Sequence, residues 1–190
     1  MSVTASRHPR IERVLFEADA IHKRVCELGR RITEDYSGRR PVLIAILKGS
    51  VIFLADLIRE IRLDCPVDFI GMSSYAGDVV PTGVVRIVLD LRESVEGKDV
   101  LVIEDIVDRG LTISYLRENL LTRGPRSIEV CSLLDKPDCR KVPIQPKYRG
   151  FVIPDLFVIG YGLDYEELYR NLPYIGVLKQ DKGPADGARA

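Results

Sequence analysis

The sequence predicts an α/β fold in which a central, mostly parallel sheet is flanked by helices. Three observations carry this prediction. Continuously apolar segments alternate along the chain with segments whose apolar residues recur every three or four positions. Apolar strands without polar alternation are typical of parallel sheets that are covered on both faces. The chain has 190 residues, which is the size of a single domain with a proper core.

The first half of the chain is expected to contain five elements: a helix within 17–36, a strand at 41–47, a helix at 50–61 and strands at 66–75 and 84–90. The first helix is indicated by apolar residues at spacings of four, three and four, namely Ile21, Val25, Leu28 and Ile32. The second helix is expected to face inward through Leu54, Leu57, Ile58 and Ile61. A polar, glycine-containing segment separates the two later strands.

The second half is expected to continue with a strand at 100–103, a helix at 111–121 and strands at 127–134, 155–160 and 174–178. Gly124 and Pro125 end the helix, because neither residue extends a helix well. A looser segment rich in Pro, Lys and Arg occupies residues 136–150, and a short acidic helix is expected just after residue 160. Residues 181–190 have the composition of a flexible tail.

The composition argues against several classes of protein. The 28 basic and 28 acidic residues balance to a formal net charge of +0, which gives no support to a nucleic-acid-binding protein. The four cysteines form no CxxC pair and only two histidines are present, so the sequence does not predict a structural zinc site. Scattered thiols, and the absence of a signal-peptide or membrane-spanning pattern, lead us to expect a cytoplasmic protein.

The segment 100–112, VLVIEDIVDRGLT, is the strongest functional signal. A strand that belongs in a core ends in three carboxylates, which repel one another unless a cation or a hydroxyl-rich group binds among them. The turn that follows leads into a helix, where backbone N–H groups, Gly110 and the Thr112 hydroxyl would form a phosphate cradle. An alternative of equal weight is that Asp108 caps the helix and Gly110 only turns the chain.

Glu104 and Asp105 favour the first interpretation. Adjacent carboxylates suit the vicinal hydroxyls of a ribose, or a Mg²⁺ ion held among them. A sugar phosphate therefore explains the segment better than an anion alone. The P-loop pattern GxxxxGK[ST] is absent, and Asp105 and Asp108 are too far apart for a phosphatase of the Asp-x-Asp type.

An apolar strand followed by Glu-Asp, two apolar residues and Asp-x-Gly-x-Thr resembles the phosphoribosyl pyrophosphate motif of the type I phosphoribosyltransferases. More narrowly, residues 10–180 resemble the hypoxanthine (guanine) phosphoribosyltransferases through an ordered series of motifs: ILKGS, SSY, EDIVDRGLT, LLDKPDCR, PDLFVIGYGLDY and YRNLPYIGVL. The resemblance implies the type I fold over residues 1–180, with a small hood that the amino- and carboxyl-terminal segments build over the active site.

The resemblance also implies a reaction: Mg²⁺-dependent transfer of ribose 5-phosphate from phosphoribosyl pyrophosphate to N9 of hypoxanthine or guanine, giving IMP or GMP and pyrophosphate. Asp108 matches the general acid–base residue beside N7 of the purine. Glu104 and Asp105 match the pair that binds the ribose hydroxyls and Mg²⁺. The residues that match the 5-phosphate loop are Arg109, Gly110, Leu111 and Thr112.

The remaining site residues are implied by the resemblance alone. Lys48 and Gly49 match the pyrophosphate loop, in which the Leu47–Lys48 peptide is expected to be cis. Arg170 matches a pyrophosphate contact and Asp164 the ligand of a second Mg²⁺. Residues expected at the purine or over the reacting centre are Lys136 at the exocyclic oxygen, Phe157 stacked on the ring, Val158 at the ring edge through its backbone, and Ser74 and Tyr75 in a closing loop. Taken without the resemblance, Phe157 and Val158 read as core packing.

One position departs from the family pattern. The family has Thr or Ser where this chain has Arg109, so a long cation replaces a hydroxyl beside the phosphate. Arg109 either adds charge near the phosphate or crowds the cradle. Two alternatives to the main interpretation stay open: a regulator that binds phosphoribosyl pyrophosphate or nucleotide, and a xanthine–guanine phosphoribosyltransferase. Family members are oligomers, so a homodimer or homotetramer is expected.

Overall fold

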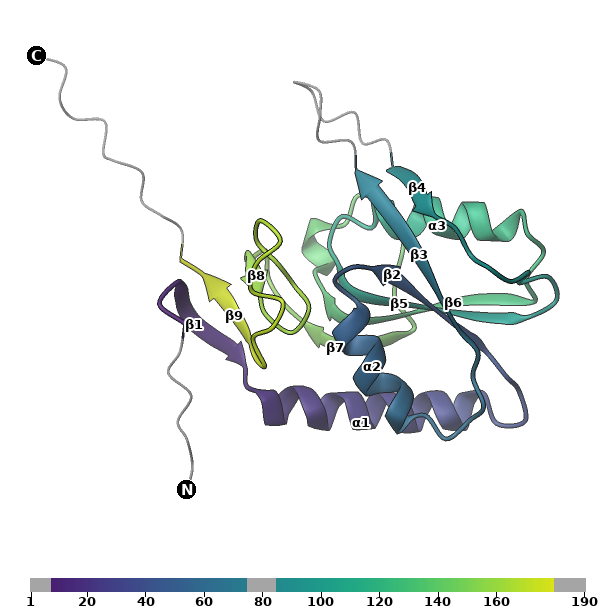
Figure 1. Ribbon diagram of the computed structural model, residues 1–190, viewed down its shortest axis with the longest axis horizontal. Coiled ribbons are helices and arrows are strands. Elements are labelled where there is room, and N and C mark those ends of the chain that lie inside the picture. The colour runs from purple at the N-terminus through teal and green to yellow at the C-terminus, as the bar shows by residue number, and fades with distance from the viewer. Residues whose placement is uncertain (1–7, 75–84, 180–190) are drawn as a thin grey trace, which may run out of the picture.

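The computed structural model describes residues 8–74 and 85–179, which form two sheets and three α-helices (Figure 1). The first elements are β1 (Ile11–Phe16), α1 (Ala18–Asp35), β2 (Val42–Leu47), α2 (Val51–Glu60), β3 (Val67–Ser74) and β4 (Val85–Leu89). They are followed by β5 (Asp99–Val107), α3 (Leu111–Leu121), β6 (Ser127–Asp135), a 3-10 turn (Pro137–Cys139), β7 (Tyr148–Val152), β8 (Val158–Ile159) and β9 (Ile175–Leu178).

The larger sheet has six strands in the order β4-β3-β2-β5-β6-β7. Its five strands from β3 to β7 run parallel, and only β4 is antiparallel to its neighbour β3. β2 lies between β3 and β5, so the chain adds β3 and β4 on one side of β2 and then crosses to add β5, β6 and β7 on the other side. The predicted α/β fold with a mostly parallel sheet is confirmed.

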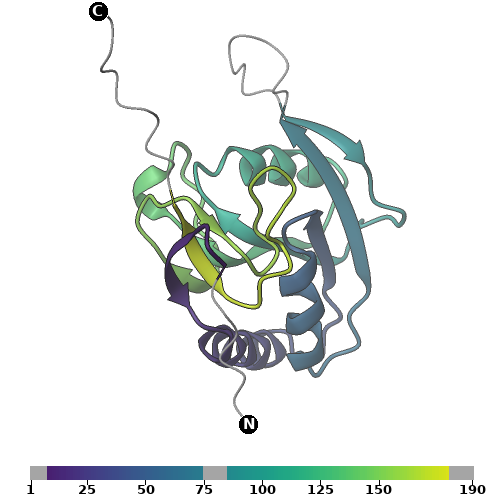
Figure 2. The same cartoon turned by 60° about the vertical axis from the view of Figure 1, so that its left-hand side comes forward.

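The core lies on both faces of this sheet. Side chains alternate along β2, so Leu43 and Ala45 pack beneath α1 and α2 while Ile44 and Ile46 pack beneath α3. Figures 1 and 2 show the same division, with α1 and α2 on one side of the sheet and α3 on the other. Both faces of β2 are covered by apolar side chains, which explains why segment 41–47 shows no alternation of polar and apolar residues.

α1 buries the apolar residues that its periodicity predicts, whereas α2 differs in part from the prediction. α1 buries Ile21, Val25, Leu28 and Ile32, as expected. α2 buries Phe53, Leu54 and Leu57, whereas Ile58 is only partly buried. Ile61 is buried but lies just beyond the helix.

The second sheet has three antiparallel strands, in the order β1-β9-β8, and it joins the two end segments of the described chain (Figure 2). β1 and β7 were not predicted. The expected strand at 155–160 is reduced to the two residues of β8, because its first residues form the loop that enters the small sheet.

The prediction of a short acidic helix after residue 160 is wrong. Residues 161–170 form an irregular loop in which four side-chain-bearing residues have positive φ angles, namely Tyr161, Glu166, Glu167 and Tyr169. That backbone conformation is incompatible with a right-handed helix. Two isolated bridges, Gly160 with Leu163 and Tyr165 with Leu168, shape the loop instead.

Some expectations fall outside the described residues: Tyr75, the segment 76–83 and the tail 181–190. Within the ranges 8–74 and 85–179, the structure has no helix of the length and apolar character needed to cross a bilayer.

Candidate active site

Several of the predicted site residues lie at or just beyond the carboxyl ends of neighbouring strands in the six-stranded sheet. Lys48 and Gly49 follow β2, Asp108 follows β5 and Lys136 follows β6. These three strands are parallel neighbours, so their carboxyl ends meet at the same edge. In open α/β sheets, this edge is where ligands bind.

Glu104 is buried at this edge without a partner for one of its oxygens. Among the described residues, no group donates a hydrogen bond to Glu104 Oε2. Burial, and then the charge of the neighbouring Asp105, raises the pKa of Glu104 well above its usual range. Burial likewise raises the pKa of Asp105 to about 6. A hydrogen bond that Asp105 Oδ1 accepts from the Ile106 N–H at 2.9 Å acts in the opposite direction and lowers this pKa. Glu104 therefore keeps a buried oxygen that the described residues leave unpaired, next to Asp105, and the two carboxylates together can accept an external donor or cation.

Gly49 brings the loop after β2 directly against Asp105. A Cβ atom at Gly49 would lie 1.7 Å from Asp105 Oδ2, so no larger residue fits without movement. The loop after β8 lies against the same glycine, since a Cβ atom at Gly162 would lie 2.1 Å from the Gly49 carbonyl oxygen. The Leu47–Lys48 peptide is cis, as expected. The loop after β2 thus packs against the Asp105 side chain on one side and against the backbone of the loop after β8 on the other.

Two cations of the site share one carboxylate. Lys48 Nζ lies 2.7 Å from Glu167 Oε2, and Arg170 Nη2 lies 3.4 Å from Glu167 Oε1. Arg170 also pairs with Asp164 at 2.9 Å and donates to the Gly162 carbonyl at 2.8 Å. The hydrogen bond from Lys48 is the main reason that the pKa of Glu167 is lowered. Lys48 and Arg170 are therefore close enough to bind one anionic group between them.

The helix after the acids begins at a glycine. Gly110 is the N-cap of α3, with a φ of 81°, and no side chain caps this helix. The proposal that Asp108 caps α3 is therefore wrong, whereas Gly110 does turn the chain in a conformation that favours glycine. The hydroxyl-bearing Thr112 lies in the first turn of α3. Asp108 is free to act outside the helix, and its side chain is 47% exposed.

Arg140 supports this turn, a role that the sequence did not reveal. Its Nη1 donates to the Asp108 carbonyl at 2.6 Å, and its Nη2 forms an ion pair with the buried Asp135. A Cβ atom at Gly110 would lie 2.9 Å from Arg140 Cδ, so the side chain packs against the glycine. The backbone of Arg109 is held from the same segment, since its carbonyl accepts from Lys141 N at 3.0 Å, while the Arg109 side chain is exposed.

Lys136 places a buried cation beside Asp108. Lys136 Nζ lies 4.0 Å from Asp108 Oδ2 and 3.2 Å from Asp155 Oδ1, and its side chain is 8% exposed. The Lys136 N–H donates to the Val107 carbonyl at 3.0 Å, which fixes the lysine next to the end of β5. Asp155, which sequence reasoning did not single out, has its pKa lowered chiefly by its hydrogen bond with Lys136. A proton acceptor and an ammonium donor therefore face the same space.

The two residues expected at the purine differ in burial. Phe157 is 50% exposed and contacts only the edge of Tyr165 among the described aromatic rings, with 5.7 Å between ring centroids. Core packing is therefore the wrong interpretation for Phe157. Val158 is buried and pairs with Val177 between β8 and β9, so core packing is correct for its side chain. Ser74 is the last residue of β3 and pairs with Val85.

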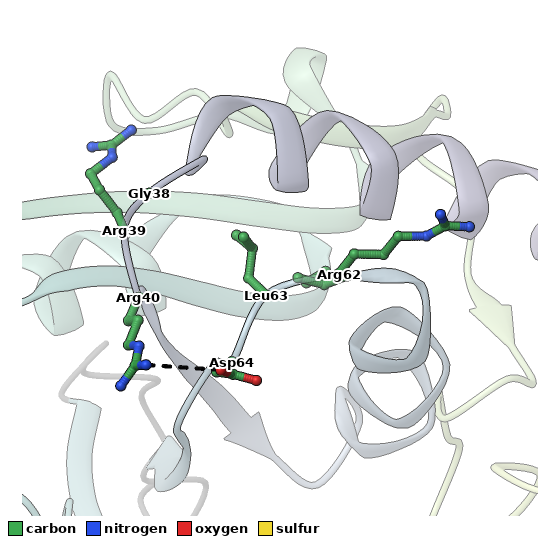
Figure 3. Close-up of a pocket in the computed structure, with 7 residues that line it drawn as sticks. Gly38, Arg39, Arg40, Arg62, Leu63 and Asp64 are labelled. Carbon is green, nitrogen blue, oxygen red and sulfur yellow. Dashed lines mark ion pairs between the residues drawn. The ribbon is translucent and has the colours of Figure 1, made fainter.

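A hollow at the opposite edge of the sheet does not compete with this site (Figure 3). It has a volume of about 520 Å³ and lies between residues 38–40 and 61–64, just before β2 and β3 begin. Its one ion pair joins Arg40 to Asp64 at 3.9 Å, while the Arg39 and Arg62 side chains point away from the hollow and from each other. Its cations do not converge on a common point, so they do not form an anion site.

Comparison with known proteins relates this chain to one family. The model of the phosphoribosyl transferase domain matches residues 15–166. Hypoxanthine-guanine phosphoribosyltransferase of Bacillus subtilis is 52% identical over 169 residues, which cover 89% of this chain and 94% of that protein. The bifunctional protein TilS/HprT of Listeria monocytogenes is 48% identical over 176 residues, 93% of this chain, but the matched region spans only 27% of that longer protein.

A solved structure shows the same fold. The crystal structure of a hypoxanthine phosphoribosyltransferase from Staphylococcus aureus aligns with a TM-score of 0.88 at 48% sequence identity. The alignment covers 94% of this chain and 97% of that one, so the shared fold extends over nearly the whole of both chains.

Proposed function

This chain belongs to the phosphoribosyltransferase family, and we propose that it transfers ribose 5-phosphate from phosphoribosyl pyrophosphate to N9 of hypoxanthine, giving IMP and pyrophosphate in purine salvage. Guanine is a second substrate and gives GMP. The observation that carries the proposal is the buried, unpaired oxygen of Glu104 beside Asp105. Asp105 meets the loop that carries Lys48 at Gly49, and Asp108, which pairs with Lys136, lies three residues after Asp105 in the chain.

The acid pair fits both a ribose and Mg²⁺. Glu104 Oε2 is buried with no donor from the described chain, and the pKa of each acid is raised, which is the state of carboxylates that still need a donor or a cation. Glu104, Asp105 and Asp164 offer the oxygen ligands that Mg²⁺ prefers. Mg²⁺ bound there would neutralise charge on the leaving pyrophosphate. The ribose hydroxyls would donate to Glu104 and Asp105.

The chain's own residues supply alignment and proton transfer. N9 of the purine attacks C1′ of the ribose as the C1′–oxygen bond to pyrophosphate breaks, and the proton on N7 passes to Asp108. Arg140 holds the carbonyl of Asp108, which keeps this residue at the end of β5 while its carboxylate stays accessible. Lys48 and Arg170 would bind the released pyrophosphate in place of Glu167, which already bridges them. Phe157 offers an exposed ring for the purine.

Lys136→Ala is expected to raise the KM for hypoxanthine by about tenfold, because its buried ammonium is the donor for the purine 6-oxygen. Steady-state kinetics with each substrate varied in turn measures the effect. Lys141→Ala is the matched control, since Lys141 is exposed on the same segment and contacts Arg109 through its backbone, which the substitution leaves in place. A change confined to the KM for phosphoribosyl pyrophosphate would remove Lys136 from purine recognition.

Arg109→Thr tests the departure from the family pattern. The Arg109 side chain is exposed, so we expect it to add charge near the phosphate and not to crowd the cradle. The substitution is expected to raise the KM for phosphoribosyl pyrophosphate by about two- to fivefold. Kinetics at low and high salt provide the measurement, because the effect of an exposed charge shrinks with screening. A fall in this KM would show that Arg109 crowds the site.

The proposed substrate range is tested by offering hypoxanthine, guanine, xanthine and adenine in turn, with phosphoribosyl pyrophosphate and Mg²⁺. A cationic donor at the 6-position favours an oxygen there, so hypoxanthine and guanine are expected to react and adenine is not. Turnover of xanthine with guanine, but not of hypoxanthine, would redirect the proposal to a xanthine–guanine enzyme. No turnover with any base, together with tight nucleotide binding, would support a regulator.

We also propose that the chain works as a homodimer or homotetramer in the cytoplasm, as its resemblance to an oligomeric family implies.

A further inference from the structure

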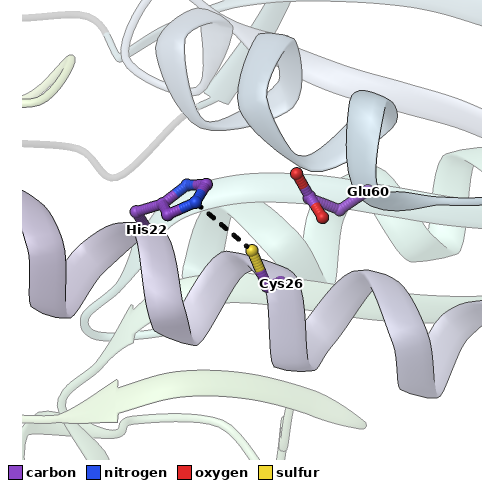
Figure 4. Close-up of side chains that lie close together, drawn as sticks. All are labelled: His22, Cys26 and Glu60. Carbon is purple, nitrogen blue, oxygen red and sulfur yellow. Dashed lines mark hydrogen bonds between the residues drawn. The ribbon is translucent and has the colours of Figure 1, made fainter.

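A second cluster of reactive side chains lies outside the site described above, between α1 and α2 (Figure 4). His22 and Cys26 come from α1 and Glu60 is the last residue of α2. One ligand atom from each of the three lies within 4.8 Å of the others, and Cys26 Sγ is 3.7 Å from His22 Nε2. Figure 4 shows the imidazole and the carboxylate on either side of the thiol.

We propose that His22, Cys26 and Glu60 form a zinc-binding site that joins α1 to α2. The proposal stands on geometry first. His22 and Cys26 are four residues apart, so they share one face of α1, and Glu60 reaches that face from the other helix. Because the three ligand atoms already lie within 4.8 Å of one another, small side-chain rotations bring them to one ion, which lowers the ordering cost of binding a metal.

The packing of the helices holds Glu60 in place. A Cβ atom at Gly29 would lie 2.5 Å from Glu60 Cβ and 2.8 Å from its backbone carbonyl, so α1 and the end of α2 touch where only glycine fits. Just beyond, the Arg62 N–H donates to Thr33 Oγ1 at 3.0 Å, which ties the chain after α2 to α1 again. The backbone and Cβ of Glu60 are therefore held against α1, which keeps its carboxylate within reach of Cys26.

The ligand types select zinc over harder cations. An imidazole nitrogen, a thiolate sulfur and a carboxylate oxygen are all common zinc ligands, and a water molecule would complete a tetrahedron. Mg²⁺ and Ca²⁺ avoid thiolate, so they would not compete here. Sequence pattern does not reveal this site, because the cysteines lack CxxC spacing and Glu60 lies 34 residues beyond Cys26. The fold, and not the spacing, brings the three ligands together.

Metal binding must also displace the thiol proton. Burial, and then a hydrogen bond with Glu60, raises the pKa of Cys26, while Arg30 acts in the opposite direction. Zinc would convert the thiol to a thiolate and release its proton, so the affinity is expected to fall as the pH is lowered. His22 is exposed and Cys26 is partly buried, so an ion can reach the site from solvent.

The test is a titration of the metal-free full chain with Co²⁺ as a spectroscopic substitute for zinc, in buffer with a non-thiol reductant. Excess Mg²⁺ is included so that the carboxylates of the proposed active site are already occupied. One equivalent of Co²⁺ is expected to give a thiolate-to-cobalt charge-transfer band in the near-ultraviolet, together with visible bands of tetrahedral cobalt, and Zn²⁺ is expected to bleach both. Zinc at about 100 times its Kd is expected to raise the Tm by roughly 5 °C.

Variants separate this site from adventitious binding. Cys26→Ser is expected to abolish the charge-transfer band, and His22→Ala to weaken binding by about tenfold or more. Cys65→Ser is the matched control and is expected to keep the wild-type spectrum, because Cys65 is a partly buried free thiol outside the cluster. Since His22 is exposed, His22→Ala should melt like the wild type without metal. Absence of the band in the wild type, or its persistence in Cys26→Ser, would overturn the proposal.

Discussion

Asp108→Asn is expected to reduce kcat by about 10²- to 10⁴-fold, the usual contribution of a general acid–base residue, while the KM for phosphoribosyl pyrophosphate changes by less than about threefold. The carboxylate at this position is half exposed, caps no helix and lies 4.0 Å from the buried Lys136 ammonium. Asparagine has nearly the same shape but cannot accept the purine N7 proton. Steady-state and single-turnover kinetics in both directions give the measurement.

Asp138→Asn is the matched control for this experiment. Asp138 is an exposed acid on the 3-10 turn two residues after Lys136, and no role in the site is proposed for it. Its replacement is expected to leave kcat unchanged. If Asp108→Asn turned over as fast as the wild type, Asp108 would have no part in proton transfer. A loss that appeared only in the KM for phosphoribosyl pyrophosphate would make it a binding residue instead.

Gly49→Ala is expected to lower kcat/KM for phosphoribosyl pyrophosphate by about 100-fold or more and to cost roughly 1–3 kcal/mol of unfolding free energy. The added methyl group would lie 1.7 Å from Asp105 Oδ2, so either the loop that carries Lys48 or Asp105, the acid proposed to bind the ribose, must move. Both movements separate groups that act on the same substrate. Denaturant unfolding and steady-state kinetics measure the two effects.

A double-mutant cycle identifies the cause of that loss. Asp105→Ala removes the carboxylate that the new methyl group meets, so Gly49→Ala is expected to destabilise this background less than the wild type. Gly162→Ala is the comparison, because its Cβ atom would meet the Gly49 carbonyl oxygen, which Asp105→Ala leaves in place. Its cost is therefore expected to be the same in both backgrounds. Equal costs for Gly49→Ala in both backgrounds would show that the contact with Asp105 is not the cause.

The sequence predicted those parts of the fold in which local pattern and tertiary environment agree. The buried strand β2 and the helices α1 and α3 have strong periodicity or continuous apolar character, and they lie where expected. β1 and β7 were missed because both mix charged and apolar residues, and their strand conformation depends on partners far along the chain, β9 and β6. The loop 161–170 was mistaken for a helix because positive φ angles fall on residues other than glycine, which sequence pattern does not reveal.

The same distinction holds for the site. The acids at the end of β5 were predicted from the segment 100–112 itself, where an apolar strand ends in carboxylates, whereas the roles of Lys48 and Lys136 came from the family resemblance. Glu167, Asp155 and Arg140 were not predicted, because each acts through a contact that no local pattern records. Glu167 meets Lys48 across 119 residues of sequence, and Arg140 meets Asp108 across 32. The partnerless oxygen of Glu104 is likewise visible only once the fold is known.

The most direct measurement is a crystal structure of this chain with IMP and Mg²⁺ bound. The expected result places the pentose hydroxyls against the carboxylates of Glu104 and Asp105, with the 5′-phosphate at the backbone N–H groups of residues 109–112. A pentose located elsewhere, with Glu104 and Asp105 hydrogen-bonded only to the protein, would contradict the proposed role of the acid pair.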